Sequence, residues 1–407
     1  MTASRSSIGR RAFLAGTVAA AGAVAAGPAA WAADPTERSG PERVPFTGEH
    51  QAGIVEEARP AAAFASFDVT ARDKAELGVL MQRLTDRARA LTDGAVPTNP
   101  GIATPPMDAG LLGPEPPAGR LTVTVGVGAS LFDHRYALTA LKPRRLRPMD
   151  TFADDDLDPA QCHGDLLLQL CADSHDVVLN ALRDLTRSTR GLMQPRWRIN
   201  GFRPAPRPDG AARNLMGFKD GTANPDPADA AGMDRLVWIR PDGGEPAWTV
   251  GGSYLVVRTI RMLVEFWDRV GIGEQERMLG RRKDTGAPLS GSVETDLPDY
   301  SDDPTGAVTP LDSHIRMANP RTSATDGSRL LRRAYNYDRG IDVNGNLDMG
   351  LLFTCFQQDL DRQFVTVQKR LAGEPLVDYI SPVGGGYFLA LPGVTDERDS
   401  YASGLLS

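Results

Sequence analysis

The sequence predicts an α+β fold built from two ferredoxin-like domains with antiparallel sheets. Apolar residues alternate along short segments in both halves of the chain, which indicates strands. Longer segments with helical spacing separate these strands, so each half reads roughly β-α-β followed by β-α-β, the ferredoxin-like order. The chain has 407 residues, of which 41% are apolar, and this is enough for two such cores.

The first half supplies four strands and two helices. Each helix places leucine, valine and alanine side chains on one face, and each strand shows alternating or continuous apolar residues. A proline-rich stretch over 94–119 predicts a long excursion from the fold. In chain order we expect a strand at 63–69, a helix at 73–91, strands at 121–127 and 166–170, a helix at 174–189 and a strand at 196–202.

The second half repeats this pattern without visible sequence identity to the first. Its stretch over 284–313 is rich in glycine, proline and aspartate, which predicts an irregular segment that ends at His314. In chain order we expect strands at 235–239 and 252–258, a helix at 263–270, a strand at 350–356, a helix at 359–371 and a strand at 386–390.

These elements divide the chain into four parts. Residues 1–32 are an export signal, 33–60 a flexible arm, 61–220 the N-terminal domain and 221–407 the C-terminal domain. The two domains join near 214–232. Because cofactor pockets often form where domains meet, this junction is the expected place for a functional site.

The first 32 residues have the features of a signal peptide. Arg10 and Arg11 are adjacent and precede Phe13-Leu14, and the apolar stretch that follows is too short and too weakly apolar to span a membrane. Ala30-Trp31-Ala32 offers a small-x-small cleavage site. The paired arginines resemble a twin-arginine signal, which would take the folded chain through the twin-arginine export machinery to the periplasm or cell envelope. An ordinary secretory signal is the alternative.

Charge and cysteine content exclude several classes of protein. The net charge is −7, and removal of the three arginines in residues 1–32 leaves a still more acidic chain, which disfavours nucleic acid and anionic lipid as partners. The sparse cysteines, Cys162, Cys171 and Cys355, do not suggest a disulfide framework. A zinc site near Cys162 and Cys171 is disfavoured because it lacks a Cys-x-x-Cys pair.

Two short segments carry the expected chemistry. The segment 217–225, Gly-Phe-Lys-Asp-Gly-Thr-Ala-Asn-Pro, supplies a carboxylate, Asp220, on a tight turn. The segment 314–321, His-Ile-Arg-Met-Ala-Asn-Pro-Arg, supplies a histidine, and the arginines of Leu331-Arg332-Arg333 follow. A haem peroxidase needs these parts, namely one axial histidine, an acid/base group and a cation on the open face.

Together with Gly384-Gly385-Gly386-Tyr387-Phe388, these segments resemble the dye-decolourising (DyP-type) peroxidase family, in particular the exported branch that includes deferrochelatases. The resemblance covers most of the chain after position 60. It implies one haem b per chain in a pocket of the C-terminal domain. It also implies hydrogen peroxide and a reducing substrate as partners, and it is compatible with a homo-oligomer.

The resemblance also assigns roles to individual residues. His314 matches the proximal iron ligand, and Asp378 is the expected carboxylate partner of its ring, although a solvated Asp378 is an equal alternative. Gly221, Thr222 and Ala223 are expected against the haem edge. Asn319, Pro320 and Arg321 are expected on the proximal side, with Arg321 at a propionate.

On the open face, Asp220 matches the residue that moves a proton between the two oxygens of peroxide, and Arg332 matches the residue that stabilises the separating charge. Arg333 is the alternative to Arg332, but the next residue along a strand should face away. A carboxylate stays deprotonated, and therefore able to accept a proton, at more acid pH than an imidazole does, so we expect activity at lower pH than in a histidine-based peroxidase.

Three functions are compared on this basis: a peroxidase of phenols or dyes, a deferrochelatase that releases iron and leaves the porphyrin intact, and a haem carrier. Asp220 and Arg332 argue against the carrier, since carriage needs no proton transfer. The first two share one pocket, so both stay open. Tyr335, Tyr337 and Trp238 are available to relay electrons, but core packing is the favoured interpretation of all three.

Overall fold

The computed structural model describes residues 43–95, 98 and 101–407. The predicted signal peptide, 1–32, lies outside this range. In the first half, the elements are β1 (Ala61–Val69), α1 (Lys74–Thr92), β2 (Thr122–Gly128), β3 (Leu166–Ala172), α2 (His175–Ser188) and β4 (Met193–Phe202). All six predicted elements of this half are therefore present, with ends that differ by a few residues.

The second half is longer and less regular. Its helices are α3 (Ala230–Leu236), α4 (Val264–Trp267), α5 (Ile272–Leu279), α6 (His314–Ala318), α7 (Thr366–Leu371) and α8 (Ser403–Leu406). Its strands are β5 (Ser253–Met262), β6 (Leu331–Arg332), β7 (Tyr335–Ile341), β8 (Leu347–Gln357) and β9 (Ile380–Ala390). A π-helical turn over Asp361–Val365 leads directly into α7.

All the strands belong to one antiparallel sheet, and this sheet closes on itself. Its order is β5-β9-β2-β3-β1-β4-β7-β8-β6, and β5 also pairs with β8. Within the first half, the order β2-β3-β1-β4 is the one that ferredoxin-like connectivity produces. The prediction of two separate sheets is wrong, because β2 pairs with β9 and β4 pairs with β7, which joins the halves along both edges.

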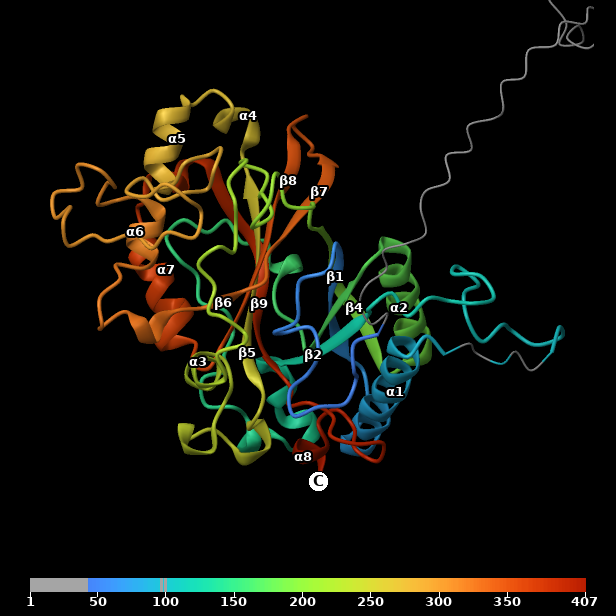
Figure 1. Ribbon diagram of the computed structural model, residues 1–407. Helices are drawn as coiled ribbons and strands as arrows, with labels where there is room; N and C mark the ends of the chain where they lie inside the picture. The colour runs from blue at the N-terminus through green and yellow to red at the C-terminus, as the bar shows by residue number, and fades with distance from the viewer. Residues whose placement is uncertain (1–42, 96–97, 99–100) are drawn as a thin grey trace, which may run out of the picture. The chain divides into compact units, whose positions relative to one another are not determined.

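Helices cover the outside of this closed sheet. In Figure 1, α1 and α2 lie side by side against the strands of the first half, whereas α5, α6 and α7 lie on the opposite side. Asp73 caps α1 by accepting a hydrogen bond from the backbone N–H of Glu76 at 2.9 Å. Residues of β5, β8, α6 and α7 together line the cavity described below.

The core lies on both faces of the sheet. Alternate residues of β1, such as Ala63 and Phe67, pack in a cluster with α1 and α2, while Ala62 and Phe64 pack in the cluster inside the ring of strands. Tyr335, Tyr337 and Trp238 are buried members of this inner cluster. They contribute to core packing, the interpretation that the sequence favoured.

Two predicted elements of the second half need correction. The predicted strand at 235–239 is wrong, since α3 ends at Leu236 and its start is capped by Asp229, which accepts from the N–H of Gly232. The apolar residues of this stretch would be buried in a helix as well as in a strand, so the apolar pattern alone did not distinguish the two structures. The predicted helix at 263–270 is shorter in the structure, since α4 covers only Val264–Trp267, and a separate helix, α5, begins beyond the predicted range at Ile272. The strand β7 was not predicted at all.

The predicted flexible arm, 33–60, also differs where it is described. Residues 33–42 lie outside the described range. Further along, Thr47 forms a bridge with Val394, and the buried side-chain amide of Gln51 donates to the carbonyl oxygens of Val125 and Leu391 at 2.8 Å each. Residues 43–60 are therefore held against strands of both halves.

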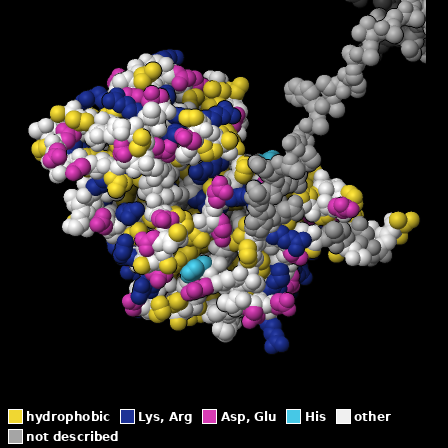
Figure 2. All heavy atoms as spheres, in the orientation of Figure 1, with side chains coloured by type: hydrophobic (Ala, Val, Ile, Leu, Met, Phe, Trp, Pro, Cys, Tyr) yellow, Lys and Arg dark blue, Asp and Glu magenta, His cyan; other side chains and the backbone are white. Residues whose placement is uncertain are grey.

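The surface of the described residues is mixed in charge. On the face shown in Figure 2, basic and acidic side chains are interspersed rather than gathered into a basic stripe. Among the helices of the described ranges, none combines the length and the apolar character needed to cross a bilayer.

Candidate active site

One cavity, of about 270 Å³, brings the two predicted segments together. Asp220 reaches it from the 217–222 segment, His314 from α6 and Arg332 from β6. Most of its wall is apolar and comes from β5, β8, α7 and the segments around them. The apolar lining residues are Met216, Phe218, Ile260, Met262, Leu279, Ile315, Leu330, Leu351, Phe353, Phe364, Val367, Leu371, Leu376 and Ile380.

Asp220 and Arg332 form an ion pair in this cavity. Nη1 of Arg332 lies 2.9 Å from Oδ1 of Asp220, and both side chains are partly buried, with 28% and 18% of their surfaces exposed. The backbone N–H of Asp220 donates to the carbonyl oxygen of Ala212 at 2.9 Å, which fixes the 217–222 segment against the preceding residues. The predicted acid/base group and cation are thus adjacent.

Asn224 ties the two predicted segments to each other. Its side-chain amide donates to the carbonyl oxygen of Arg332 at 2.7 Å and accepts from the N–H of Arg332 at 3.1 Å. Arg333 faces away, as strand geometry predicted, and its guanidinium group donates to the carbonyl oxygens of Glu56 and Glu57. Of these two neighbouring arginines, Arg332 is therefore the one that lines the cavity.

His314 is held by Glu374 rather than by Asp378. Its Nδ1 lies 2.8 and 3.0 Å from the two carboxylate oxygens of Glu374, which is buried. A carboxylate only accepts hydrogen bonds, so Nδ1 carries the proton and Nε2 is left as the metal-binding nitrogen. Burial alone would lower the pKa of His314, but the carboxylate of Glu374 raises it on balance.

The prediction for Asp378 is therefore wrong. Asp378 is exposed in the short helical turn Pro375–Tyr379, four residues beyond Glu374. Both acids follow the predicted helix 359–371, and no spacing rule in the sequence separates them. The difference arises because Glu374 directly precedes this turn, where its side chain faces α6.

The other predicted contacts mostly line the cavity. Gly221, Thr222, Ala223, Asn319 and Arg321 do so, whereas Pro320 and Asp378 do not. Sequence reasoning missed Glu374 and three further lining arginines, Arg258, Arg281 and Arg329, and it gave Asn224 no role. Arginine and glutamate are unusual as buried residues, and this is what marks these side chains as functional. Because burial becomes visible only in the fold, the sequence carried no signal for them.

The cationic groups of this cavity fit a ligand with carboxylates. Neither Arg281 nor Arg321 forms an ion pair among the residues that the structure describes. Nη1 of Arg281 donates to the backbone carbonyl oxygens of Gly286 and Glu294, whereas the buried Nε of Arg321 has no hydrogen-bond partner. Burial and the nearby guanidinium groups of Arg321 and Arg332 lower the pKa of Arg281. A flat apolar macrocycle with two propionates, bound at one imidazole, would satisfy these groups, so the residues present fit haem.

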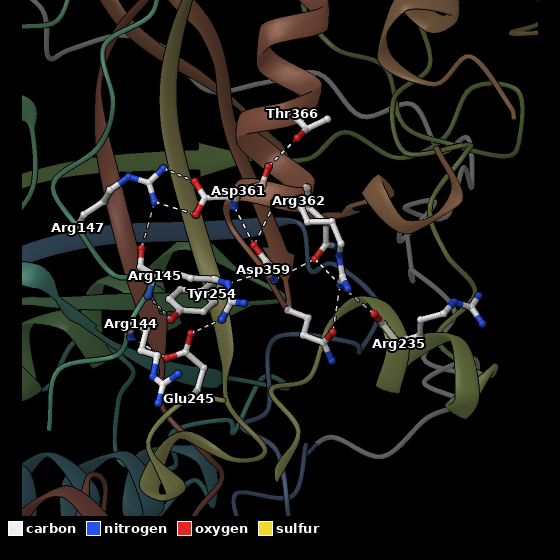
Figure 3. A network of polar contacts seen from close by, with 12 residues as sticks. Arg144, Arg145, Arg147, Arg235, Glu245, Tyr254, Asp359, Asp361, Arg362 and Thr366 are labelled. Carbon is white, nitrogen blue, oxygen red and sulfur yellow. Dashed lines mark hydrogen bonds and ion pairs between the residues drawn. The ribbon is translucent and has the colours of Figure 1, made fainter. Parts of the chain in front are cut away.

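An ion-pair network supports one wall of the cavity (Figure 3). Arg145 binds Glu245 and Asp359 at 2.7 and 2.8 Å, and Arg147 binds Asp361 at 2.7 Å. Asp361 begins the π-helical turn that carries Phe364, a lining residue. The network therefore ties the 144–147 segment to the element that shapes this wall.

Known protein families match both halves of the chain. The family model described as Dyp-type peroxidase, N-terminal, matches residues 51–203, and the one described as Dyp-type peroxidase, C-terminal, matches residues 211–395. The chain is 50% identical over 374 residues to a deferrochelatase of Escherichia coli strain K12, covering 90% of this chain and 88% of that protein.

Solved structures give the same result. The crystal structure of a DyP-type peroxidase from Cellulomonas bogoriensis has a TM-score of 0.80 and 39% identity, covering 90% of this chain and 98% of that one. Ferric DtpA from Streptomyces lividans has a TM-score of 0.81 and 36% identity, covering 89% and 97%. The chain is thus a member of the Dyp-type peroxidase family of haem oxidoreductases.

Proposed function

We propose that this protein binds one haem b and uses it to reduce hydrogen peroxide while oxidising phenolic or dye-like donors. The observation that carries this proposal is that the Asp220–Arg332 ion pair shares a cavity with His314, whose ring is fixed by Glu374. The sequence has no Cys-x-x-Cys-His segment for covalent attachment, which supports non-covalent haem.

Each residue has a separate task. Haem supplies the redox-active iron when it is bound, and His314 holds it through Nε2. Asp220 accepts a proton from peroxide and returns it to the oxygen that leaves. Arg332 stabilises the negative charge that develops as the two oxygens separate. Arg281 and Arg321 hold the propionates.

Peroxide-dependent oxidation of a phenol by the purified, haem-loaded protein tests this proposal directly. We expect oxidation that requires both peroxide and haem. A protein that binds haem stoichiometrically but oxidises no phenol or dye with peroxide would contradict it.

Release of iron from haem is the second candidate function, and it rests on the 50% identity to a named deferrochelatase. The same pocket would serve this reaction. Incubation with haem and a reductant, followed by porphyrin fluorescence, separates the two. Metal-free protoporphyrin as the main product would favour the deferrochelatase, whereas intact haem after many turnovers of a phenol would favour the peroxidase.

Replacing Glu374 with glutamine tests how the histidine is held. The amide removes the negative charge opposite Nδ1, so His314 becomes a weaker ligand, and partners of this kind typically contribute about 10- to 100-fold to affinity or activity. We expect weaker haem binding, measured by titration and by the rate of haem transfer to apomyoglobin. Asp378→Asn is the matched control, and a loss in that variant instead would restore the original assignment.

We further propose export through the twin-arginine route to the periplasm or cell envelope. The paired Arg10 and Arg11 support it, although they lie outside the described residues. Changing both to lysine is expected to leave the protein in the cytoplasm, as measured by cell fractionation. Unchanged export of this double variant would refute the twin-arginine route.

A further inference from the structure

Lys219, the residue before Asp220, is a buried cation with a specific partner. Only 2% of its side chain is exposed, and its Nζ lies 2.5 Å from Oε2 of Glu294. The same Nζ donates to the carbonyl oxygen of Asp209 at 2.8 Å. Burial of a charge is costly unless it is paired. The carboxylate of Asp209 lies farther away, at 3.7 Å, and is 88% exposed, so the partly buried carboxylate of Glu294 is the main partner of this cation.

The carboxylate of Glu294 also binds two other points around Asp220. Its Oε1 accepts from the hydroxyl of Thr222 at 2.8 Å and from the backbone N–H of Ala211 at 3.0 Å. Lys219 and Thr222 lie on either side of Asp220 in the chain. Ala211 directly precedes Ala212, whose carbonyl oxygen accepts from the backbone N–H of Asp220. One carboxylate therefore holds both flanks of the acid/base residue.

The surroundings leave this carboxylate little freedom. A Cβ on Gly210 would lie 2.0 Å from Oε2 of Glu294, and one on Gly286 would lie 2.7 Å from Cδ of Lys219. The backbone carbonyl of Glu294 accepts from Nη1 of Arg281, a cavity-lining residue, at 3.0 Å. Glu294 is thereby fixed at both its backbone and its side chain, although it lies in the irregular stretch 284–313.

The hydrogen bonds that Glu294 accepts favour the ionised form of its carboxylate. Burial alone would raise the pKa of Glu294, but the contacts with Lys219, Thr222 and Ala211 lower it on balance. The ionised carboxylate and the buried ammonium group thus support each other. Asn224 fixes Arg332 from the other side, so each member of the Asp220–Arg332 pair has its own support.

We propose that Glu294 is a positioning residue for Asp220, acting through the Lys219–Glu294 pair and Thr222. This inference rests on the proposed role of Asp220. Without the carboxylate of Glu294, Lys219 keeps only the carbonyl oxygen and the more distant, exposed carboxylate of Asp209. The charged anchors that Glu294 gives Lys219 and Thr222 in the 217–222 segment are then lost. Asp220 would then spend less time where it can accept the proton of peroxide, while haem binding at His314 would be preserved.

The test compares Glu294→Gln with Asp296→Asn in the haem-loaded, full-length protein. Asp296 belongs to the same stretch, but its carboxylate bonds only Ser292 and Val293. Hydrogen–deuterium exchange of peptides covering 217–222 gives a readout independent of activity. Loss of a buried charged contact is expected to speed this exchange and to slow the reaction with peroxide, each by about tenfold, in Glu294→Gln alone.

The inference would be overturned if Glu294→Gln showed the same hydrogen–deuterium exchange of 217–222 and the same rate of reaction with peroxide as the parent protein. Faster exchange with a parental peroxide rate would also overturn it, because Glu294 would then be structural only. A parental rate in Asp220→Asn would instead refute the proposed function, and the exchange data would still decide whether Glu294 holds the segment.

A double variant, Lys219→Met with Glu294→Gln, covers the case in which Glu294→Gln does not fold. It leaves no buried charge unpaired, so thermal stability should be restored. The slow reaction with peroxide should persist, because the anchors of the 217–222 segment are still missing. A parental rate in this double variant would contradict a positioning role.

Discussion

Replacement of His314 by alanine is expected to abolish haem binding or weaken it severely. Among the described residues that line the cavity, His314 is the single histidine, and its Nδ1 is already committed to Glu374. Since loss of a residue that merely orients a ligand costs about 10- to 100-fold, loss of the ligand itself should cost more. Haem titration followed by absorbance measures the affinity, and the Soret band should shift or disappear.

His134→Ala is the matched control for this experiment. His134 is exposed and does not line the cavity. It should bind haem as the parent protein does. If His314→Ala keeps the parental affinity and absorption spectrum, the ligand is another residue, and the assignment of the whole cavity to haem must be revised.

Asp220→Asn and Arg332→Leu are expected to bind haem normally but to react slowly with peroxide. The first change removes the group that accepts the proton, and the second removes the positive charge that stabilises the leaving oxygen. Loss of one such group typically lowers a rate by about 10²-fold or more. Stopped-flow mixing of haem-loaded protein with peroxide, monitored by absorbance, gives the bimolecular rate constant.

Two comparisons make this result specific. Asp226→Asn changes an exposed acid six residues beyond Asp220 and should leave the rate unchanged. Arg332→Lys keeps a positive charge but not the bidentate geometry, and should fall between the parent and Arg332→Leu. Parental rates in both Asp220→Asn and Arg332→Leu would show that water or another side chain moves the proton.

The first half of the fold was predictable because its elements are regular. Strands β1 to β4 and helices α1 and α2 have clear apolar periodicity, and each was expected within a few residues. In the second half, β7 was missed because its Tyr-Asn-Tyr-Asp sequence is followed by polar, exposed residues. Closure of the sheet depends on pairing between residues far apart in sequence, such as Phe202 with Asn336, which local patterns do not encode.

Site residues that belong to short recognisable segments could be predicted from the sequence. Site residues whose role depends on contacts made in the fold could not. Asp220, His314 and Arg332 follow from short segments, and the structure brings all three to one cavity. Glu374 and Glu294 carry no such signal. Each lies in irregular backbone. The partner of Glu374, His314, is 60 residues away in the sequence, and the partner of Glu294, Lys219, is 75 residues away, so only the fold reveals these pairs.

Closure of the sheet has a consequence for the order in which the protein can mature. The ring is completed by β9, which lies close to the C-terminus and pairs with β2 on one side and β5 on the other. Until β9 has been synthesised, β2 and β5 present unpaired edges, which are prone to aggregation. The ring therefore cannot close before β9 has been synthesised, and neither can the part of the cavity wall that Ile380 and Pro382 of β9 supply. Any export step that requires a folded cargo would inherit this delay.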